Sequence, residues 1–527
     1  MAESVLNVRG KRPDRTRTTG VPLWMFVAGT MIAAVAAILA FDAYSGMIGI
    51  LAPRFEIIQK GASRIIKVPP GGNLQAAIER AEGGDIVELQ AGAVYYGEIK
   101  LPNKTLTDYV TIQSSAAANL PPDKRVGPDQ SQSMAKIVTP RADRPAISAA
   151  NGAHHYRFVG IEFSTSSAVY TSNLVLFGTG ESRREQVPHD IEIDRCYFHP
   201  FKSGVTRRAI ALNSAATTIK NSYIEGFAFM NEETQGICGW TGTRNVHILN
   251  NYVEGGAENI MFGGADPDNA ELIPSDIEIR GNHLNKPAEW FKKTTLKTLF
   301  ELKDAKRVQF TGNLLTNNWS GSAFRVTVRN QEGRAPFSTI EDVTIRDNVI
   351  NNAGEGMNIL GKDDTYPSQT LQRLTVTNNL FLAIGGHGVE GSAYFIQIAD
   401  GNDIAISNNT VLNSGNIATI YGTLPTGFVF RDNITGHGNY GIHGPLDLRS
   451  PQARTMFQNN IFVNMNHVPS DDYAFPPGNT IIADLRDVGF VNPASGDYRF
   501  SPTSKFKRGF GCDVLKLEPD LLKIGQK

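Results

Sequence analysis

Short segments of alternating apolar and polar residues recur through most of the chain. Each has three or four alternating residues, a polar pair and then an apolar pair, as in VHILNNYV, VTIRDNVI and IAISNNTV. The second residue of the polar pair falls at Cys196, Ser222, Asn251, Asn282, Asn313, Asn348, Asn379, Asn409, Asn433 and Asn460. The mean step, (460 − 196)/9, is about 29 residues, a period typical of solenoid repeats.

A unit of this length with period-two strands and almost no helical pattern predicts one coil of a solenoid. Alternation indicates that one side of each strand is buried. Stacked asparagines can hydrogen-bond along a ladder, and asparagine tolerates the left-handed backbone of a sharp corner, so we interpret them as scaffold. The leucine frame of leucine-rich repeats is absent, and propeller blades need longer repeats. We therefore expect an all-β fold, a single-stranded right-handed parallel β-helix.

Both ends of the solenoid show distinct patterns. In Pro70–Leu89 an apolar helical face (Leu74, Ala77, Ile78 and Ala81) follows Asn73, which predicts a capped amphipathic helix over the open N-terminal end of the core. Residues 114–145 are polar and rich in Pro, Ala and Ser, and we expect a long loop there. The predicted β-helix with its N-terminal cap spans 65–465. Residues 466–527 lose the repeat, and we expect them to fold over the other end as a C-terminal cap.

The N-terminal region has a different character. Residues 21–41 (VPLWMFVAGTMIAAVAAILAF) form an uncharged apolar run long enough to span a bilayer, preceded by five basic residues and only two acidic ones. This pattern predicts a cytoplasmic tail over 1–20, a transmembrane signal-anchor over 21–41, a linker over 42–64, and a periplasmic or extracellular β-helix. A cleaved signal peptide is the alternative, although its apolar region would normally be shorter and end in a small-residue cleavage site.

Composition narrows the range of partners. Hydrophobic residues make up 41% and charged residues 20% of the 527 residues, and the formal net charge is −1. No global basic field therefore favours nucleic acid as a partner. The three cysteines, Cys196, Cys238 and Cys512, fit neither a zinc site nor a dense disulfide framework. Three buried thiols are the favoured interpretation, and a Cys196–Cys238 bridge is the alternative.

Three features together carry a family resemblance: the asparagine ladder, the opening GGNLQAAIERAEGGDIVELQAG, and the ending DYRFSPTSKFKRGFG (Asp497–Gly511). Over about residues 65–515 the chain resembles the pectate-lyase-like superfamily of right-handed parallel β-helix proteins. That superfamily contains lyases, glycosidases, esterases, epimerases and adhesins. The resemblance therefore implies the fold more specifically than the activity.

A second strand follows each corner, as in TLFELKD, AFRVTVRN and GMNILGKDD. If the aliphatic residues point inward, the alternate residues form an outward column: Cys238, Trp240, Asn259, Met261, Glu301, Lys303, Arg325, Thr327, Arg329, Asn358, Phe395, Gln397 and His443, with Tyr421 from an adjacent strand. Neighbouring strands lie about 4.8 Å apart. We therefore expect Glu301, Lys303, Arg325 and Arg329 to form one charged patch, with Trp240, Tyr421 and Gln397 as substrate-binding residues for a sugar polymer.

The resemblance implies a chemistry for this patch. Polysaccharide lyases of this fold abstract a proton beside a uronate carboxylate with Lys or Arg and neutralise the carboxylate. A lysine can be tuned toward its neutral form more easily than an arginine, so Lys303 is the candidate base. Arg325 and Arg329 are candidates to grip the carboxylate, and Glu301 completes the predicted catalytic set.

The stretch TLFELKDAKRVQFTGN (Thr298–Asn313) is similar in spacing to the chondroitinase-B and alginate lyase family. That family has a catalytic Arg at the position of Lys303. Its catalytic Lys would fall near Gly263 or Gly264, where this chain has no base, and its acid pair near Glu258. The chain therefore departs from the pattern of that family.

Other carboxylates suggest two further chemistries. Glu258, Asp266 and Asp268 could supply oxygen ligands to a calcium ion, although such residues are also common in loops. Glu258, Glu301 and Asp304 could supply a glycosidase pair, but no feature selects two of them. Glu254, which follows the same corner, is interpreted as a turn residue.

The sequence thus predicts a membrane-anchored, exported protein that acts on an acidic polysaccharide by β-elimination or hydrolysis. Its predicted partners are that polymer and, through one N-terminal helix, the lipid bilayer. A carbohydrate-binding or cell-surface structural solenoid without turnover is the alternative, so whether the protein is an enzyme stays open.

Overall fold

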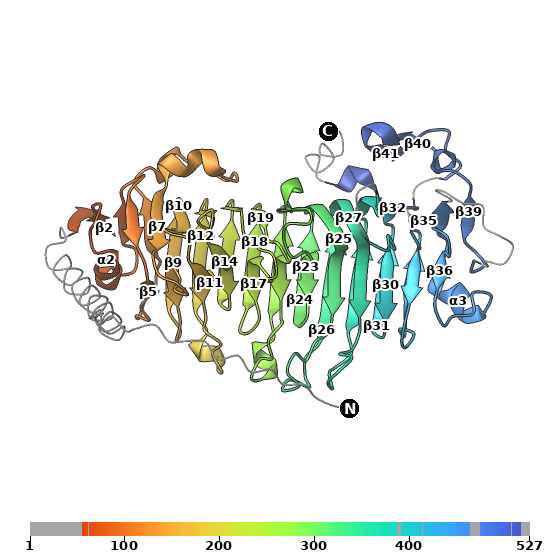
Figure 1. Cartoon of the computed structure of the whole chain (residues 1–527), viewed down its shortest axis with the longest axis horizontal. Coiled ribbons are helices and arrows are strands. Elements are labelled where there is room, and N and C mark those ends of the chain that lie inside the picture. The colour runs from red at the N-terminus through yellow and green to blue at the C-terminus, as the bar shows by residue number, and fades with distance from the viewer. Residues whose placement is uncertain are drawn as a thin grey trace, which may run out of the picture. The chain divides into compact units, whose positions relative to one another are not determined.

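The computed structural model describes residues 55–61, 63–386, 391–413, 415–463, 475–506 and 509–517. Two long sheets dominate these residues, and their strands stack coil upon coil (Figure 1). The predicted tail, the apolar run 21–41 and most of the linker lie outside the described residues. Among the residues that are described, no helix is long and apolar enough to cross a membrane.

The first sheet contains fifteen strands in the described residues. All its pairs are parallel except the first, β1 with β2. In order, its strands are β1 (Glu56–Lys60), β2 (Ser63–Val68), β3 (Ile86–Leu89), β6 (Val110–Ser114), β9 (His154–Val159), β12 (His189–Asp194), β15 (Ala215–Lys220), β18 (Arg244–Leu249), β21 (Ser275–Arg280), β24 (Ala305–Thr311), β26 (Ile340–Arg346), β28 (Gln372–Thr377), β31 (Asn402–Ser407), β34 (Val429–Arg431) and β37 (Phe457–Gln458).

The second sheet takes up the chain after each corner. Its first line of parallel strands is β4 (Val94–Tyr96), β7 (Ala135–Thr139), β10 (Ile161–Thr165), β13 (Tyr197–Phe198), β16 (Tyr223–Ile224), β19 (Tyr252–Glu254), β22 (His283–Asn285), β25 (Leu314–Thr327), β27 (Val349–Leu360), β29 (Leu380–Ile384), β32 (Thr410–Asn413), β35 (Ile434–Gly436), β38 (Ile461–Val463) and β39 (Thr480–Ile482). Its second line is β5 (Ile99–Leu101), β8 (Ile147–Ala149), β11 (Tyr170–Phe177), β14 (Val205–Leu212), β17 (Gln235–Gly239), β20 (Glu258–Phe262), β23 (Thr298–Leu302), β30 (Ile396–Ala399), β33 (Ala418–Ile420) and β36 (Ile442–His443). The long strands β25 and β27 run through both lines.

The predicted asparagine ladder is present. From Asn251 to Asn460, each asparagine donates its backbone N–H to the side-chain oxygen of the next, at 2.8–3.0 Å. Ser222 extends the ladder by accepting from the Cys196 N–H, and Asn479 ends it. The left-handed backbone belongs to the residue before each ladder position, such as Asn250 or Asp347, rather than to the ladder residue as expected. One residue thus turns the corner and the next ties the coils together.

The N-terminal cap forms as predicted. Helix α2 (Leu74–Arg80) begins at Asn73, whose side chain accepts the Ala76 N–H, and it buries Leu74, Ala77 and Ile78. The expectation of a featureless loop over 114–145 is wrong, because strand β7 and short 3-10 helices form there. Apolar side chains of this segment, including Leu120 and Met134, pack on Tyr197 and fix it to the solenoid wall.

The C-terminal segment packs differently from the expectation. The stack continues to β39, inside the segment 466–527 assigned to the cap. After α3 (Pro451–Met456) and β39, the chain forms the hairpin β40 (Phe490–Asn492) and β41 (Asp497–Phe500). Tyr498, Cys512, Val514 and Leu517 pack against Leu314, Val349 and Leu380. This segment therefore covers the side of middle coils rather than only the open end. All three cysteines are free and buried, so the bridge is wrong.

Removing one rung of the ladder tests its energetic role. In Asn348→Ala, the Asn313 N–H and the Phe310 carbonyl each lose a buried partner. We expect a loss of about 2–4 kcal/mol in the free energy of unfolding, measured by urea denaturation. The control Asn402→Ala changes an exposed asparagine of β31 and should stay within about 0.5 kcal/mol of the parent. Equal losses in the two variants would contradict a ladder that stabilises the fold.

Glu254 is a buried side chain at the end of β19 rather than a plain turn residue. It accepts hydrogen bonds from the Tyr252 hydroxyl at 2.7 Å and the Gly226 N–H at 2.8 Å. Burial raises the pKa of Glu254 to about 7, from an ordinary value of 4.5. Between these values the folded protein keeps a proton that the unfolded chain has lost, so the free energy of unfolding falls as pH rises through this window.

Glu254→Gln keeps the acceptor oxygen and removes the titration. We expect the fall in unfolding free energy between about pH 5 and about pH 8 to shrink by on the order of 3 kcal/mol. Urea titrations of parent and variant across this range measure it. If the unfolding free energies of parent and variant change with pH in the same way, Glu254 is not the source of the fall.

Candidate functional site

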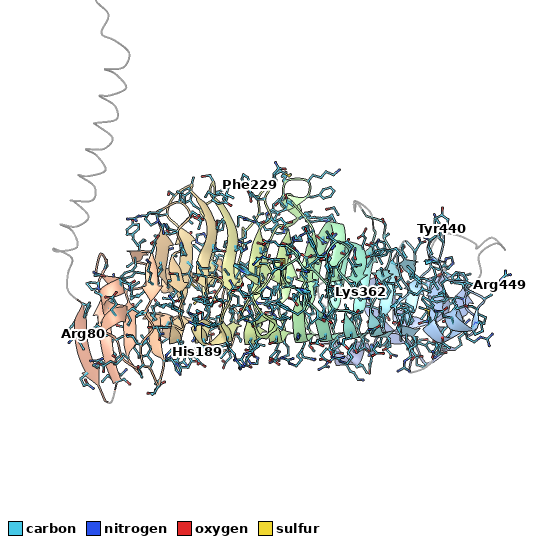
Figure 2. The ribbon with its side chains drawn as sticks, turned by 90° about the horizontal axis from the view of Figure 1, so that it is seen from below. Arg80, His189, Phe229, Lys362, Tyr440 and Arg449 are labelled. Atoms are coloured by element: carbon cyan, nitrogen blue, oxygen red, sulfur yellow. The ribbon has the colours of Figure 1, made fainter. Side chains whose placement is uncertain are left out.

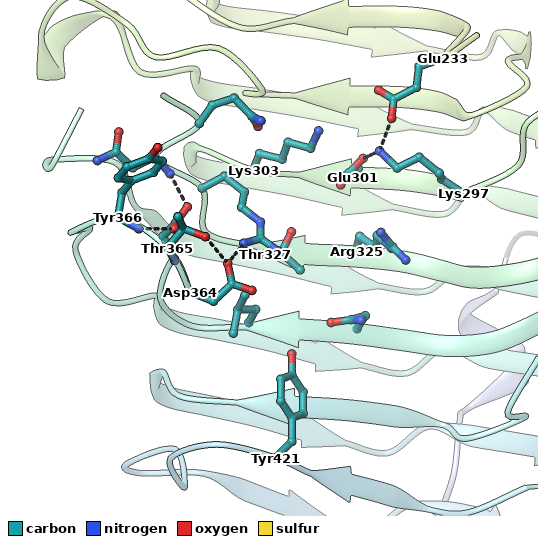
Figure 3. Close-up of a pocket in the computed structure, with 16 residues that line it drawn as sticks. Glu233, Lys297, Glu301, Lys303, Arg325, Thr327, Asp364, Thr365, Tyr366 and Tyr421 are labelled. Carbon is teal, nitrogen blue, oxygen red and sulfur yellow. Dashed lines mark hydrogen bonds and ion pairs between the residues drawn. The ribbon is translucent and has the colours of Figure 1, made fainter. Parts of the chain in front are cut away.

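The charged patch lies in a cleft of about 410 Å³ on the outer face of the second sheet (Figure 3). Strands β23, β25 and β27 and the loops that follow them provide most of its wall. Its lining residues are Glu233, Lys297, Glu301, Lys303, Arg325, Thr327, Arg329, Asn330, Gln331, Asn358, Leu360, Asp363, Asp364, Thr365, Tyr366 and Tyr421. All four residues of the predicted catalytic set are among them.

The strand register accounts for this gathering. Met261, Glu301, Arg325, Asn358 and Gln397 pair in succession across β20, β23, β25, β27 and β30. The predicted column continues to His443 of β36 through Thr419, which the sequence analysis did not include. Because the pairing is parallel, neighbouring coils place these side chains about 4.8 Å apart.

Two members of the predicted column point inward instead. Phe395 packs against Phe381 and Phe430 in the core. The Asn259 amide donates to the carbonyls of Val253 and Asn285. Phe395 lies directly before β30 and Asn259 is the second residue of β20, and strict alternation fails at both of these strand starts.

A lysine outside the predicted column, Lys297, holds the carboxylates together. Lys297 Nζ lies 3.1 Å from Glu233 Oε1 and 3.6 Å from Glu301 Oε2 (Figure 3). It also lies 2.8 Å from Glu258 Oε1. Glu258 and Glu301 are 0% and 2% exposed, respectively. Gln235 Nε2 donates to the other oxygen of Glu258 at 2.8 Å. Lys297 directly precedes β23, outside the alternating pattern, so period-two reasoning gave no signal for it.

Burial and the lysine act on the two buried acids in opposite ways. Burial raises the pKa of Glu301, and the neighbouring Glu258 adds to this, outweighing Lys303 and Lys297. Burial also acts to raise the pKa of Glu258, but Lys297 and Gln235 hold it below its usual value. The two acids therefore differ, because the pKa of Glu258 is held below its ordinary value and that of Glu301 is raised above it.

The turn before Glu258 rests on a second buried lysine. Lys286 is fully buried, and its ammonium donates to the carbonyls of Gly255 at 2.7 Å and Gly256 at 2.6 Å. Burial lowers the pKa of Lys286 to about 7. The side chain thus supports the turn that carries Glu258 into β20.

The three predicted cations are not equivalent. Arg329 forms an ion pair with Asp364. No side-chain hydrogen bond or ion pair of Lys303 occurs in the part of the chain that the structure describes. Arg325 Nε is buried without a hydrogen-bond partner there. Among the described residues, Lys303 and Arg325 are therefore the cleft cations whose charged groups are not held in an ion pair.

The predicted calcium ligands do not form a set. Glu258 is taken up by Lys297 and Gln235, and Asp266 Oδ2 accepts the N–H groups of Glu332 and Arg334. Asp268 is exposed. Within the described ranges, no group of three His, Cys, Asp or Glu side chains is arranged to hold a metal ion. These residues do not fit the proposed calcium ion.

The predicted substrate-binding residues are only partly brought together. Tyr421 lines the cleft. Gln397 lies just outside the lining, where it accepts from the Tyr394 hydroxyl at 2.8 Å. Trp240 also lies outside, with the Arg208 guanidinium 5.2 Å from its ring centre, so one face of the indole is already covered.

Comparison with solved structures shows parallel β-helix proteins at low sequence identity. A PL6 family alginate lyase aligns with a TM-score of 0.51 and 10% identity, covering 87% of this chain and 58% of that one. An alginate lyase from Paenibacillus sp. has a TM-score of 0.40 and 13% identity, with coverage of 62% and 96%. The Streptococcus pneumoniae surface protein and adhesin PfbA has 0.39 and 12%, with coverage of 78% and 95%.

No protein-family model matches the chain, and no curated protein matches it in sequence. The chain spans less than two thirds of the PL6 lyase. The predicted resemblance to pectate-lyase-like parallel β-helix proteins is confirmed at the level of the fold. The activity has to be argued from the cleft itself.

Replacing Lys297 tests its role between the acids. In Lys297→Met, Glu258 stays buried without its cation, and we expect a loss of about 3–5 kcal/mol in unfolding free energy. In the double variant Lys297→Met/Glu258→Gln the buried charge is also absent, and most of that loss should be recovered. Urea denaturation of the four proteins of this cycle gives the coupling. If the losses of the two single variants simply added up in the double variant, the ion pair between Lys297 and Glu258 would be contradicted.

Proposed function

We propose that this protein binds an acidic polysaccharide in the cleft and cleaves it by β-elimination. The observation that carries the proposal is the pair of cations without protein partners, Lys303 and Arg325, on adjacent strands of one cleft. A guanidinium with a free buried N–H matches a carboxylate. The parallel β-helix, a fold shared with polysaccharide lyases, is consistent with this proposal.

The elimination assigns a role to each residue. Arg325 binds the uronate carboxylate and neutralises the charge that develops when the adjacent carbon loses its proton. Lys303, in its neutral form, takes that proton. The electron pair of the C–H bond becomes the new C=C bond, and the bond to the leaving oxygen breaks. The leaving oxygen then takes the proton from the Lys303 ammonium, which restores the amine.

Glu301 and Arg329 act through neighbouring groups. Glu301 pairs in register with Arg325 on the neighbouring strand, and burial raises its pKa, so this carboxyl competes less with a substrate carboxylate for the guanidinium. Arg329 donates its backbone N–H to the Lys303 carbonyl at 2.8 Å, and its guanidinium is held by Asp364. Arg329 thus closes one edge of the cleft.

Hydrolysis is the weaker candidate for this site. A glycosidase needs an accessible carboxylate as nucleophile or base beside its acid. Glu258 is 0% exposed and bound to Lys297 and Gln235. The pair of Glu258 and Glu301 therefore lacks a carboxylate that a sugar or an attacking water could reach.

Export and anchoring belong to the same proposal. The apolar run 21–41 and its basic flank favour a signal-anchor, with the β-helix on the periplasmic or extracellular side, where polysaccharides occur. We also propose that the coil is right-handed, the hand taken by nearly all parallel crossovers. These features rest on the sequence.

The activity test compares the parent with Lys303→Ala. Full-length protein in detergent is incubated with uronate-containing polymers, and the ultraviolet absorbance of unsaturated uronate is followed beside reducing ends. We expect Lys303→Ala to lower kcat by about 10²- to 10⁴-fold, because the base is lost. Lys362→Ala, at an exposed lysine on the next loop (Figure 2), is the matched control and should keep parental activity.

The other outcomes distinguish elimination from hydrolysis and from binding without cleavage. Reducing ends without absorbance would replace elimination by hydrolysis. Retention of the polymer without either signal would favour the non-catalytic binding protein. No binding of any uronate polymer would overturn the proposal.

A further inference from the structure

The charges of the cleft follow an order along the stack of coils. Lys303 and Arg325 stand on the neighbouring strands β23 and β25 or directly after them. An acidic side chain lies beyond them on each side: Glu233 precedes β17, and Asp364 follows β27. The free positive charge is therefore confined to the middle of the cleft.

Glu233 forms the first acidic border. It lies on the loop between β16 and β17, the loop that also carries Phe229 and projects at one edge of the molecule (Figure 2). Its side chain is 47% exposed although it bonds to Lys297. That lysine already neutralises the buried Glu258, so Glu233 keeps negative charge at this end of the cleft.

Asp364 and Asp363 form the second acidic border. Asp363 accepts the N–H groups of Asn330, Thr365 and Tyr366, which fixes the loop after β27. Asp364 is 60% exposed and pairs with Arg329. The loop thus occupies the guanidinium of Arg329, which could otherwise have bound a second substrate carboxylate.

The spacing limits how many acidic sugars the cleft can accept. Because Glu301 pairs with Arg325, Lys303 lies one coil from Arg325 (about 4.8 Å) and two residues further along the strand (about 6.6 Å), so the two free cations stand roughly 8 Å apart. Only this short stretch of the cleft carries free positive charge. A chain with a carboxylate on every sugar would place its next carboxylates toward Glu233 and Asp364. Like charges brought together in this way disfavour binding.

Aromatic side chains lie on the side of Asp364. Tyr366 is 43% exposed on the same loop, and Tyr421, directly after β33, also lines the cleft (Figure 3). Aromatic faces pack against the apolar faces of sugar rings without requiring charge. This flank therefore suits a neutral sugar.

We propose that the substrate is a heteropolysaccharide in which single acidic sugars are flanked by neutral ones, and that Glu233 and Asp364 determine this specificity by rejecting polyuronates. This inference rests on the proposed function of the cleft. It adds a substrate class and two specificity-determining residues to that function.

The test measures the affinity of full-length protein for two probes at equal uronate concentration and low salt. Hyaluronan alternates uronate with a neutral sugar, and polygalacturonate carries a uronate at every position. We expect tighter binding of hyaluronan. Glu233→Gln and Asp364→Asn should each shift the ratio of the two affinities toward polygalacturonate by about two- to fivefold. Glu271→Gln, at an exposed acid outside the cleft, should leave the ratio unchanged.

Equal or tighter binding of polygalacturonate by the parent, or an unchanged ratio in both cleft variants, would overturn the specificity and leave the proposed function standing. If neither polymer binds, the proposed function is overturned and the inference with it. Raising the salt concentration should reduce the discrimination, because the exposed carboxylates act through screened charge.

Discussion

The hydrogen bond from one asparagine to the next is the constraint on which the rest of the structure depends. Each side-chain oxygen accepts the backbone N–H of the preceding coil, and each side-chain N–H₂ reaches a carbonyl of that coil, as in Asn313 and Asn348. The bond sets both the spacing and the rotation between coils. It therefore decides which outward residues of distant segments stand in one line. Glu301, Arg325 and Asn358 share a cleft because their corners share a ladder.

The cleft combines this rigid frame with buried charge. Lys286 holds the turn that delivers Glu258, and Lys297 lies between Glu258, Glu301 and Glu233. Such buried ions cost desolvation energy and remain only where partners compensate it. Lys297 compensates the buried Glu258 below the cleft surface, and Lys286 is bound to backbone carbonyls, which leaves Lys303 and Arg325 as the cations without an ion pair. The site therefore has fixed positive groups above a layer that is already neutralised.

The coils and the charged residues of the cleft could be predicted from the sequence, because both follow from short-range patterns. Period-two alternation and the recurring asparagines predict the coils, and parallel pairing then brings Glu301, Lys303, Arg325 and Arg329 together. Residues outside regular strands escaped this reasoning. Lys297 and Glu233 precede their strands, and Phe395 and Asn259 lie where the backbone departs from strict alternation. The return of Tyr498 and Val514 to middle coils depends on long-range packing, which no local pattern records.

The packing of the C-terminal segment on middle coils also affects how the chain folds during synthesis. Coils of a solenoid contact mainly their neighbours, so they can stack in the order in which they leave the ribosome. Leu314, Val349 and Leu380, however, are covered by residues near the end of the chain. Their apolar surface stays open through the synthesis of more than a hundred further residues. The middle of the molecule is thus begun early and covered last, and a chain released before Val514 would leave an apolar flank uncovered on the same coils that carry the cleft.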